Sequence, residues 1–409
     1  MVAPKLRFQE FDDAWNKKRL DSFLERISNP VDVVADQQYT QIGIRSHGKG
    51  IFHKGSIDGK ELGNKRVFWI EPNTLVVNIV FAWERAIAVT SDSEKGMIAS
   101  HRFPMYLPKN NLSNVNFLRY FFVTNKGQKY LELASPGGAG RNKTLGQSNF
   151  AELKIDLPSL KEQTKIANFL SAVDEKIAQL SQKLHLLEQY KQGMMQKIFS
   201  QQIRFKAGDG SQFGAWESKK LNEIGQSFNG LVGKSKEDFG EGEAYITYKQ
   251  IFDHRKINLN NINFVNISPN DTQNMVKKGD IFFTTSSETA NEVAYCSVIL
   301  DDFEFPLYLN SFCFGYRPNS AKIFNSAYAS FYFRSNIFRN KIKHLAQGST
   351  RFNISKMAFM NVLIHLPMLE EQTKIANFLS TIDQKIDVVS EQLKQAKIWK
   401  KGLLQQMFV

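Results

Sequence analysis

The chain contains a long internal repeat. Residues 157–177 read LPSLKEQTKIANFLSAVDEKI and residues 366–386 read LPMLEEQTKIANFLSTIDQKI, so 16 of 21 positions match and ten consecutive residues are identical. The same offset of 209 residues continues without a gap to the end of the sequence, where it pairs Tyr190 with Trp399 and Phe199 with Phe408. Self-similarity of this length and fidelity indicates a tandem duplication.

Each copy of the repeat carries apolar residues at alternating spacings of four and three. This spacing is typical of the a and d positions of a coiled coil, and it continues for about four to five heptads. At 1.5 Å per residue, a helix of this length extends for roughly 60 Å. The positions are Ile166, Leu170, Val173, Ile177, Leu180, Leu184 and Leu187 in the first copy and Ile375, Leu379, Ile382, Ile386, Val389, Leu393 and Ala396 in the second.

A weaker similarity links the segments that precede the two helices. Arg7, Phe8 and Trp15 resemble Arg204, Phe205 and Trp216, so the two globular segments open alike. We expect four parts: globular domains over 1–156 and 204–365, and helical segments over 157–203 and 366–409.

Local patterns predict that each globular domain mixes strands and helices. Short β-rich runs bounded by Gly, Asn and Pro indicate strands at 66–70, 74–81 and 280–284. Aromatic stretches at 117–123 and 328–333 indicate buried helices. The predicted fold class is mixed α/β (α+β), and the order of the strands is not readable from these patterns.

The charge of the chain favours a polyanionic partner. The formal net charge is +13, of which the two 40-residue helical segments carry +3, so +10 lies on the globular segments. Nucleic acid is therefore the first expectation and an acidic membrane surface the second. Cys296 and Cys313 are too few for a disulfide framework or a paired zinc site. Without an apolar leader or a long apolar run, the sequence predicts a cytoplasmic protein.

Basic residues in Gly- and Asn-rich stretches are the candidate DNA contacts. Arg is the commonest reader of guanine, whereas Lys more often holds phosphate. Any one exposed cation is more often only a solvated surface residue, so the clusters are the stronger candidates. They are Arg45, His47 and Lys49 in IGIRSHGKG, Arg141 and Lys143 in GAGRNK, Lys249, Arg255 and Lys256 in YKQIFDHRK, and Arg351 in GSTRFN.

The sequence lacks an obvious catalytic or cofactor motif. The Gly-rich run at 135–144 does not have the spacing of a phosphate-binding loop, and the seven histidines form no metal-ligand pairs. Asp280, Glu288 and Glu292 could form the acidic cluster of a metal-dependent nuclease, but a rim of solvated acidic side chains is the simpler interpretation. We therefore expect no catalytic residues, no metal site and no cofactor in this chain.

The repeated helix opening resembles the specificity subunits of type I restriction-modification systems. That family has a Leu-Pro-x-Leu-x-Glu-Gln-x-x-Ile-x-x-x-Leu-x-x-x-Asp-x-x-Ile pattern twice, each time after an unlike globular domain. The matching residues are Leu157, Pro158, Glu162, Gln163, Ile166, Leu170, Asp174 and Ile177, and Leu366, Pro367, Glu371, Gln372, Ile375, Leu379, Asp383 and Ile386.

The resemblance implies a non-catalytic reader of double-stranded DNA. Two target-recognition domains would each read half of a divided sequence, and two antiparallel helices would form a pseudo-twofold spacer. The helices would also dock two methyltransferase subunits carrying S-adenosylmethionine, and restriction subunits with ATP and magnesium would join them. The helix residues expected to serve as spacer or docking positions are Glu162, Gln163, Ile166, Leu170, Asp174, Glu371, Gln372, Ile375, Leu379 and Asp383.

Two other functions are compatible with the composition. A coiled-coil adaptor would bind nucleic acid or protein without sequence discrimination. An enzyme that acts on nucleic acid would show turnover by the purified chain. A mismatch in a specific site costs about 1 to 3 kcal/mol, so sequence discrimination separates the specificity subunit from the adaptor.

Overall fold

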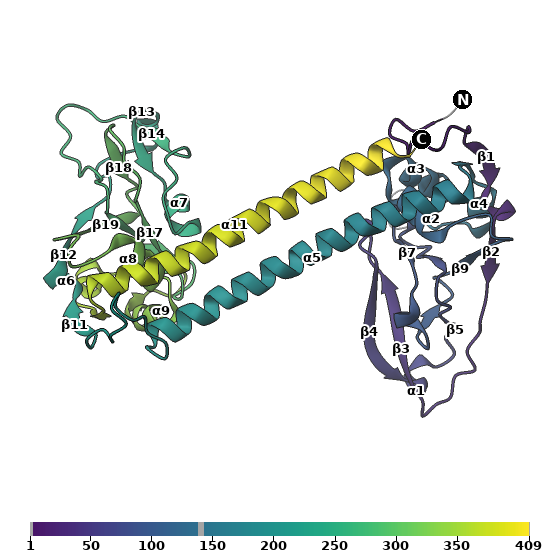
Figure 1. Cartoon of the computed structure of the whole chain (residues 1–409), viewed down its shortest axis with the longest axis horizontal. Helices are drawn as coiled ribbons and strands as arrows, with labels where there is room; N and C mark the ends of the chain where they lie inside the picture. Colours follow the sequence, from purple (N-terminus) through teal and green to yellow (C-terminus); the bar gives the residue numbers. More distant parts are fainter. Residues whose placement is uncertain (1–2, 138–142, 409) are drawn as a thin grey trace. The chain divides into compact units, whose positions relative to one another are not determined.

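The computed structural model describes residues 3–137 and 143–408 (Figure 1). The chain divides into two compact units: unit 1 contains residues 1–182 and 390–409, and unit 2 contains residues 183–389. Among the described residues, no helix combines the length and apolarity that crossing a membrane requires.

The repeated segments form the two long helices that the heptad pattern predicts. They are α5 (Leu160–Phe199) and α11 (Leu369–Gln406). The boundary between the two units falls within these helices, after residue 182 in α5 and after residue 389 in α11. Each unit therefore holds one globular domain together with the beginning of one long helix and the end of the other. The domain boundaries expected from the sequence stay a prediction.

The globular part of unit 1 is built mainly from short strands. Its elements are β1 (Asn16–Arg19), η1 (Leu20–Ser22), β2 (Leu24–Ile27), β3 (Gln38–Ile44), β4 (Ile51–Asp58), α1 (Gly59–Leu62), β5 (Val67–Trp69), β6 (Leu75–Val77), η2 (Ala82–Glu84), β7 (Ile87–Val89), η3 (Asp92–Glu94), β8 (Ile98–Ser100), β9 (Met105–Pro108), α2 (Val115–Val123), α3 (Asn125–Leu133), α4 (Gln147–Glu152) and β10 (Lys154–Leu157).

Unit 2 has a corresponding series of elements. They are β11 (Glu217–Lys220), α6 (Leu221–Ile224), β12 (Gly225–Asn229), η5 (Lys236–Asp238), β13 (Phe239–Ile246), α7 (Tyr248–Asp253), β14 (Asn263–Val265), β15 (Ile281–Thr284), β16 (Ser286–Ser287), β17 (Cys296–Val298), β18 (Leu307–Leu309), β19 (Cys313–Pro318), α8 (Ser326–Tyr332), α9 (Asn336–Ile342), η6 (Lys343–Leu345), β20 (Ala346–Gln347), β21 (Phe352–Ile354), α10 (Lys356–Met360) and β22 (Leu363–Leu366).

The two globular domains share the order of their strands. The sheet β2-β9-β6-β7 of unit 1 corresponds to β12-β19-β15-β17 of unit 2, and β4-β3-β8 corresponds to β14-β13-β18. The register also agrees, because Leu24 faces Pro108 in one sheet and Gly225 faces Pro318 in the other. The duplication seen in the helices therefore extends to the folds of the domains, as the mixed α/β prediction and the similar domain openings indicated.

Two local predictions differ from the structure in detail. The strand predicted over 74–81 ends with β6 at Val77, because the side chain of Asn78 accepts a hydrogen bond from the amide of Val80 at 3.1 Å and forms a turn. The loops before β10 and β22 each contain a short helix, α4 or α10, which the sequence patterns did not indicate.

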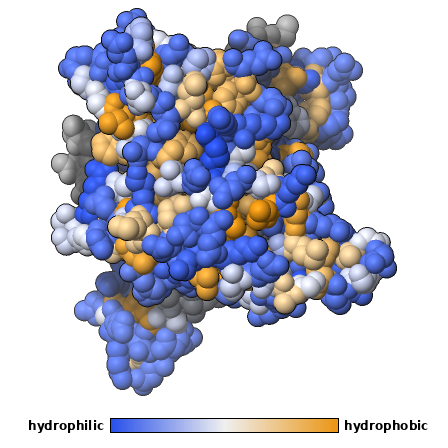
Figure 2. Space-filling view, turned by 90° about the vertical axis from the view of Figure 1, so that its left-hand side faces the viewer, coloured by the Kyte–Doolittle hydropathy of each residue, from blue (hydrophilic) through white to orange (hydrophobic). Residues whose placement is uncertain are grey.

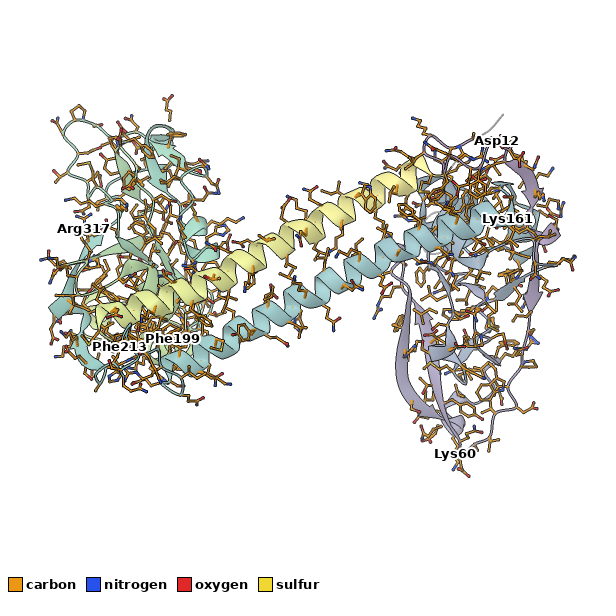
Figure 3. All side chains as sticks on the ribbon, viewed as in Figure 1. Asp12, Lys60, Lys161, Phe199, Phe213 and Arg317 are labelled. Atoms are coloured by element: carbon orange, nitrogen blue, oxygen red, sulfur yellow. The ribbon has the colours of Figure 1, made fainter. Side chains whose placement is uncertain are left out.

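Each domain core includes turns from both long helices. In unit 1, Ile166 and Leu170 from the start of α5 join Leu403 from the end of α11 and Met407 just after it. The core of unit 2 has the reverse pairing, because Ile375 and Leu379 from the start of α11 join Phe199 from the end of α5, which Figure 3 labels. Phe199 packs against Tyr328 and Tyr332 at centroid distances of 5.8 and 5.5 Å. The heptad positions at the helix ends are therefore core positions of the domains.

Apolar side chains are dispersed on the face that Figure 2 shows. The face shown in Figure 2 is largely hydrophilic, with apolar residues in small separate patches. Scattered exposed apolar side chains are normal on folded proteins and need no special function. Two exposed aromatic residues are nevertheless notable, since Tyr190 on α5 and Trp399 on α11 occupy equivalent positions of the repeat and are 51% and 53% exposed.

Candidate nucleic-acid interface

A buried glutamate fixes each domain to its helix. In unit 1, Arg7 donates two hydrogen bonds to Glu162 at 2.8 Å each, and the indole of Trp15 donates a third at 3.2 Å. Glu162 is 1% exposed, and its hydrogen bond raises the pKa of Arg7. Because a buried charge is costly unless it is paired, this contact fixes the N-terminal segment on α5.

Unit 2 repeats this contact with equivalent residues. Arg204 donates to Glu371 at 3.1 and 2.7 Å, and Trp216 donates at 3.2 Å. The similar openings of the two domains therefore have a physical cause, since each supplies an Arg and a Trp to a helix glutamate.

A buried glutamine follows each glutamate. Gln163 accepts from the amide of Asn114 at 2.9 Å and donates to the carbonyl of Pro158 at 2.9 Å. Gln372 makes the same contacts with Asn325 and Pro367, also at 2.9 Å. These bonds satisfy polar groups that would otherwise be left unpaired inside the domain.

The predicted spacer and docking residues lie mostly inside the units. Those with less than 3% exposure offer no side-chain surface to a partner, and their observed role is to join helix to domain. They are Glu162, Gln163, Ile166, Leu170, Glu371, Gln372, Ile375 and Leu379. Asp174 and Asp383 are different, because their side chains are 31% and 18% exposed.

These two aspartates form equivalent junctions. In unit 1, Asp174 pairs with Lys400 of α11, accepts from the hydroxyl of Tyr120 at 2.8 Å and lies 3.5 Å from Arg119. Both cations lie over the Tyr120 ring, with Arg119 at 4.1 Å and Lys400 at 5.8 Å from its centroid. The junction thus joins both long helices to the domain through one aromatic ring.

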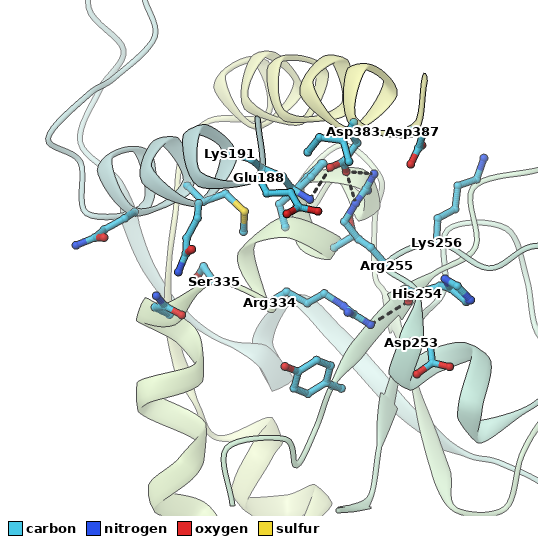
Figure 4. A pocket seen from close by; sticks show the side chains of 18 of the residues that line it. Glu188, Lys191, Asp253, His254, Arg255, Lys256, Arg334, Ser335, Asp383 and Asp387 are labelled. Carbon is cyan, nitrogen blue, oxygen red and sulfur yellow. Dashed lines mark hydrogen bonds and ion pairs between the residues drawn. The ribbon is translucent and has the colours of Figure 1, made fainter. Parts of the chain in front are cut away.

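In unit 2 the same arrangement uses Asp383 (Figure 4). Lys191 of α5 lies 2.5 Å from Asp383, and Arg255 lies 2.8 Å from it. Arg255 and Lys191 lie over the ring of Phe331, at 3.9 and 5.7 Å. Helix residues, charges and ring positions are retained, while the arginine comes from a different element of the domain.

A groove adjoins each junction. The groove of unit 2 has a cavity volume of about 670 Å³, and that of unit 1 has about 530 Å³. We call the latter the basic groove. It is lined by His47, Gly48, Arg85, Val123, Thr124, Asn125, Lys126, Lys397, Lys400, Lys401, Leu404, Gln405 and Phe408.

The predicted DNA contacts of unit 1 gather around η2. Arg45, His47 and Lys49 are exposed in the turn between β3 and β4. The backbone of this turn is fixed by a hydrogen bond of 2.7 Å from the amide of His47 to the main-chain carbonyl of Glu84. Lys143 lies 5.6 Å from the ring of Trp83. Arg141 lies outside the described residues.

The predicted contacts of unit 2 lie near the two ends of α7. Lys249 is exposed within its first turn, and Arg351 is exposed on a separate loop, 5.9 Å from the ring of Phe312. Beyond the other end, Lys256 pairs with Asp301 at 2.7 Å. Arg255 is committed to Asp383, so its observed role is structural. Contact of any of these residues with DNA stays a prediction.

The sequence patterns missed Lys397, Lys400 and Lys401. Charge was summed over 40 residues, and in the second segment five acids nearly balance six lysines, although the last four lysines all follow the last acid. The signal was local: residues 394–401 read KQAKIWKK, without an acid, whereas the equivalent residues 185–192 read HLLEQYKQ.

The acidic residues considered as a nuclease cluster have separate environments. Asp280 is buried and paired with Arg317 at 2.7 Å; burial raises its pKa, against the lowering effect of Arg317. Glu292 accepts from Thr289 at 2.8 Å, and Glu288 is exposed. Within the described parts of the chain, no three His, Cys, Asp or Glu side chains are placed to hold a metal ion.

Comparison with known proteins places both repeats in one family. The model of the type I restriction modification DNA specificity domain matches residues 16–189 and 214–397. A Methanocaldococcus jannaschii protein provisionally named as the specificity subunit of the MjaX type I restriction enzyme is 24% identical, covering 98% of this chain and 94% of the relative. The MjaVIII specificity subunit of the same organism is 27% identical over 62% of this chain and 61% of the relative.

Solved structures show the same fold. The S subunit of a type I restriction-modification system from M. genitalium has a TM-score of 0.58 and 17% identity, with 100% of this chain and 99% of that one covered. The HsdS subunit from Thermoanaerobacter tengcongensis has a TM-score of 0.50 and 18% identity, with 96% and 95% covered. At these identities the likeness establishes the architecture alone.

Proposed function

Because the chain belongs to the DNA specificity family of type I restriction-modification systems, we propose that its two globular domains each read one half of a divided DNA target. The observation that carries this proposal is the duplication, since the family model matches both repeats and the two domains share their strand order. A non-specific adaptor is disfavoured, because membership of a specificity family implies discrimination between sequences.

The long helices set the length of the unread segment between the half-sites in this proposal. Support comes from the antiparallel pairing inside each unit, where Asp174 meets Lys400 and Asp383 meets Lys191. Each helix begins in the core of one domain and ends in the core of the other.

Two methyltransferase subunits dock on the helices, and restriction subunits join them, in the cytoplasmic complex that we propose. S-adenosylmethionine, ATP and magnesium are bound by those partners, and this chain carries no catalysis. Equivalent exposed aromatic residues support two docking sites, because Tyr190 and Trp399 are half-exposed at repeat-related positions. Aromatic residues are enriched in protein interfaces.

Mapping of methylated adenine across the genome tests target recognition directly. Cells with this chain and its partner subunits should carry methylated adenine in one bipartite sequence, and cells without the chain should lose that mark. Replacement of residues 206–365 by those of another family member should change one half-site and leave the other intact. Methylation without a sequence preference would contradict the proposal.

Matched insertions test the spacer role. One heptad is inserted after Glu188 in α5 and one after Ile386 in α11, so the facing segments stay in register. Seven residues add about 10.5 Å, close to three base pairs at 3.4 Å each. The unread gap should lengthen by about three base pairs with both half-sites unchanged. An altered half-site with a constant gap would refute the spacer role.

A further inference from the structure

We propose that the basic groove of unit 1 binds DNA backbone phosphates and that the equivalent groove of unit 2 does not. The inference rests on the proposed function, because it specifies how one of the two domains holds the DNA. It concerns sequence-independent affinity and not the reading of bases.

The basic groove contains both paired cations and cations that have no carboxylate partner in the described part of the chain. Lys126 pairs with Asp156, and Lys400 pairs with Asp174. Among the described residues, Lys397, Lys401 and Arg85 have no acidic partner within ion-pair distance.

These three cations come from two separate parts of unit 1. Lys397 and Lys401 are four residues apart on α11 and therefore lie on one face of that helix. Arg85 belongs to the domain, and one of its terminal nitrogens donates to the carbonyl of Val123 at 3.3 Å. Its Nε is buried and has no hydrogen-bond partner among the residues that the structure describes. An anion in the groove would face cations of both the helix and the domain.

The groove of unit 2 has the same architecture but lacks the two unpaired lysines of α11. At the positions equivalent to Lys397 and Lys401 it has Glu188 and Gln192, while Lys191 matches Lys400. Asp387 adds a further acid to that lining. Since the junction forms with either set of residues, the extra lysines of unit 1 are not needed for folding.

Phosphate is the ligand that this charge distribution fits. Contacts to the DNA backbone come chiefly from Lys and Arg and supply most of the sequence-independent affinity. The carboxyl end of α11 opposes an anion with roughly half a negative charge, which is small against three unpaired cations. Arg45 and Lys49 are exposed in the same turn as His47, which lines the groove. A DNA backbone bound in the groove would therefore pass close to these predicted base contacts.

Replacement of the two unpaired lysines of unit 1 by the equivalent residues of unit 2 tests the proposal. The groove variant combines Lys397→Glu with Lys401→Gln, which copies the residues of unit 2. The control variant combines Lys394→Glu with Lys385→Gln; it makes the same change in net charge at exposed positions of α11 outside the groove. Each is assembled with the methyltransferase subunits, and binding to a random-sequence duplex is measured from 50 to 200 mM salt.

The plot of log affinity against log salt concentration has a negative slope, and loss of two phosphate contacts should make that slope shallower by about 1.8. The ratio of wild-type to variant affinity should therefore shrink about tenfold across this salt range. The control should keep a slope close to that of the wild type, and the groove variant should still discriminate the wild-type target from single mismatches.

Equal slopes for the groove and control variants would overturn the inference. So would a normal DNA slope combined with weaker binding of the methyltransferase subunits, which would identify the groove as a protein contact. Failure of the proposed function looks different: the wild-type complex would then bind its methylation target and random duplexes equally, whatever the slopes of the variants.

Discussion

Removal of Arg7 should expose how strongly unit 1 depends on its glutamate anchor. An Arg7→Met substitution keeps much of the aliphatic volume but leaves the carboxylate of Glu162, which is 1% exposed, with only the 3.2 Å bond from Trp15. Loss of one partner of a buried ion pair typically costs about 3 to 5 kcal/mol. We expect a loss of that size in the free energy of unfolding of unit 1.

The double variant Arg7→Met with Glu162→Gln separates the orphaned charge from the lost contacts. The amide oxygen of a glutamine still accepts from Trp15, so the remaining cost is one unsatisfied polar group, about 1 to 3 kcal/mol. The double variant should therefore be more stable than the single variant, although it differs from the wild type at one more position.

Hydrogen exchange in increasing urea provides the assay, because it reports the two units separately. Core amides of α2 should lose protection at lower urea in the Arg7→Met variant, while those of α8 should serve as the internal reference. The matched Arg204→Met variant should show the reverse pattern. A single variant that is as stable as the double variant, or a loss below about 1 kcal/mol, would refute the reasoning.

Three further predictions concern local contacts. Burial would raise the pKa of Glu94, but bonds from His53, Ser91 and Ser93 outweigh it and lower this pKa to about 2. The stabilisation by Glu94 is therefore complete above pH 4.5 and disappears as pH falls through about 2, so the stability difference between wild type and Glu94→Gln should shrink over that interval in acid titrations. A Gly225→Ala substitution places its Cβ 2.3 Å from the ring of Tyr316 and should destabilise unit 2 by about 1 to 3 kcal/mol in urea unfolding. Its control Gly193→Ala, with no atom within 4 Å, should stabilise its helix by up to about 1 kcal/mol; equal effects would contradict the steric argument. Burial raises the pKa of Cys296 to about 12 and also raises that of Cys313, so iodoacetamide at pH 8 should label neither thiol before urea is added. Rapid labelling of the native chain would show that the thiols are accessible.

Periodic features of the sequence predicted the helical part of the fold well. The heptad spacing of residues such as Ile166 and Leu170 repeats many times within one segment, and it identifies both long helices. Strand order depends on pairings between distant residues, such as Leu24 with Pro108, for which a short apolar run carries no information. The partners of Glu162 were missed for the same reason, since Arg7 is 155 residues away.

Candidate DNA contacts were harder to judge from composition. Arg255 and Lys256 are neighbours in a basic stretch, yet Arg255 is committed to Asp383 and Lys256 to an exposed pair with Asp301. Conversely, Lys397 and Lys401 belong to a segment of nearly neutral total charge and acquire a common surface only through the turn of the helix. Three-dimensional placement, and not charge count, separates structural cations from available ones.

The exchange of helix ends between the two cores also has a consequence for synthesis of the chain. Unit 2 is continuous from residue 183 to 389, whereas the core of unit 1 includes Leu403, Met407 and Phe408. At 5 to 20 residues per second, the ribosome needs on the order of 10 to 40 s to travel from the first part of unit 1 to these residues. The domain that is translated first is thus the last to complete its core, and until then its Phe117 and Phe121 lack the ring of Phe408.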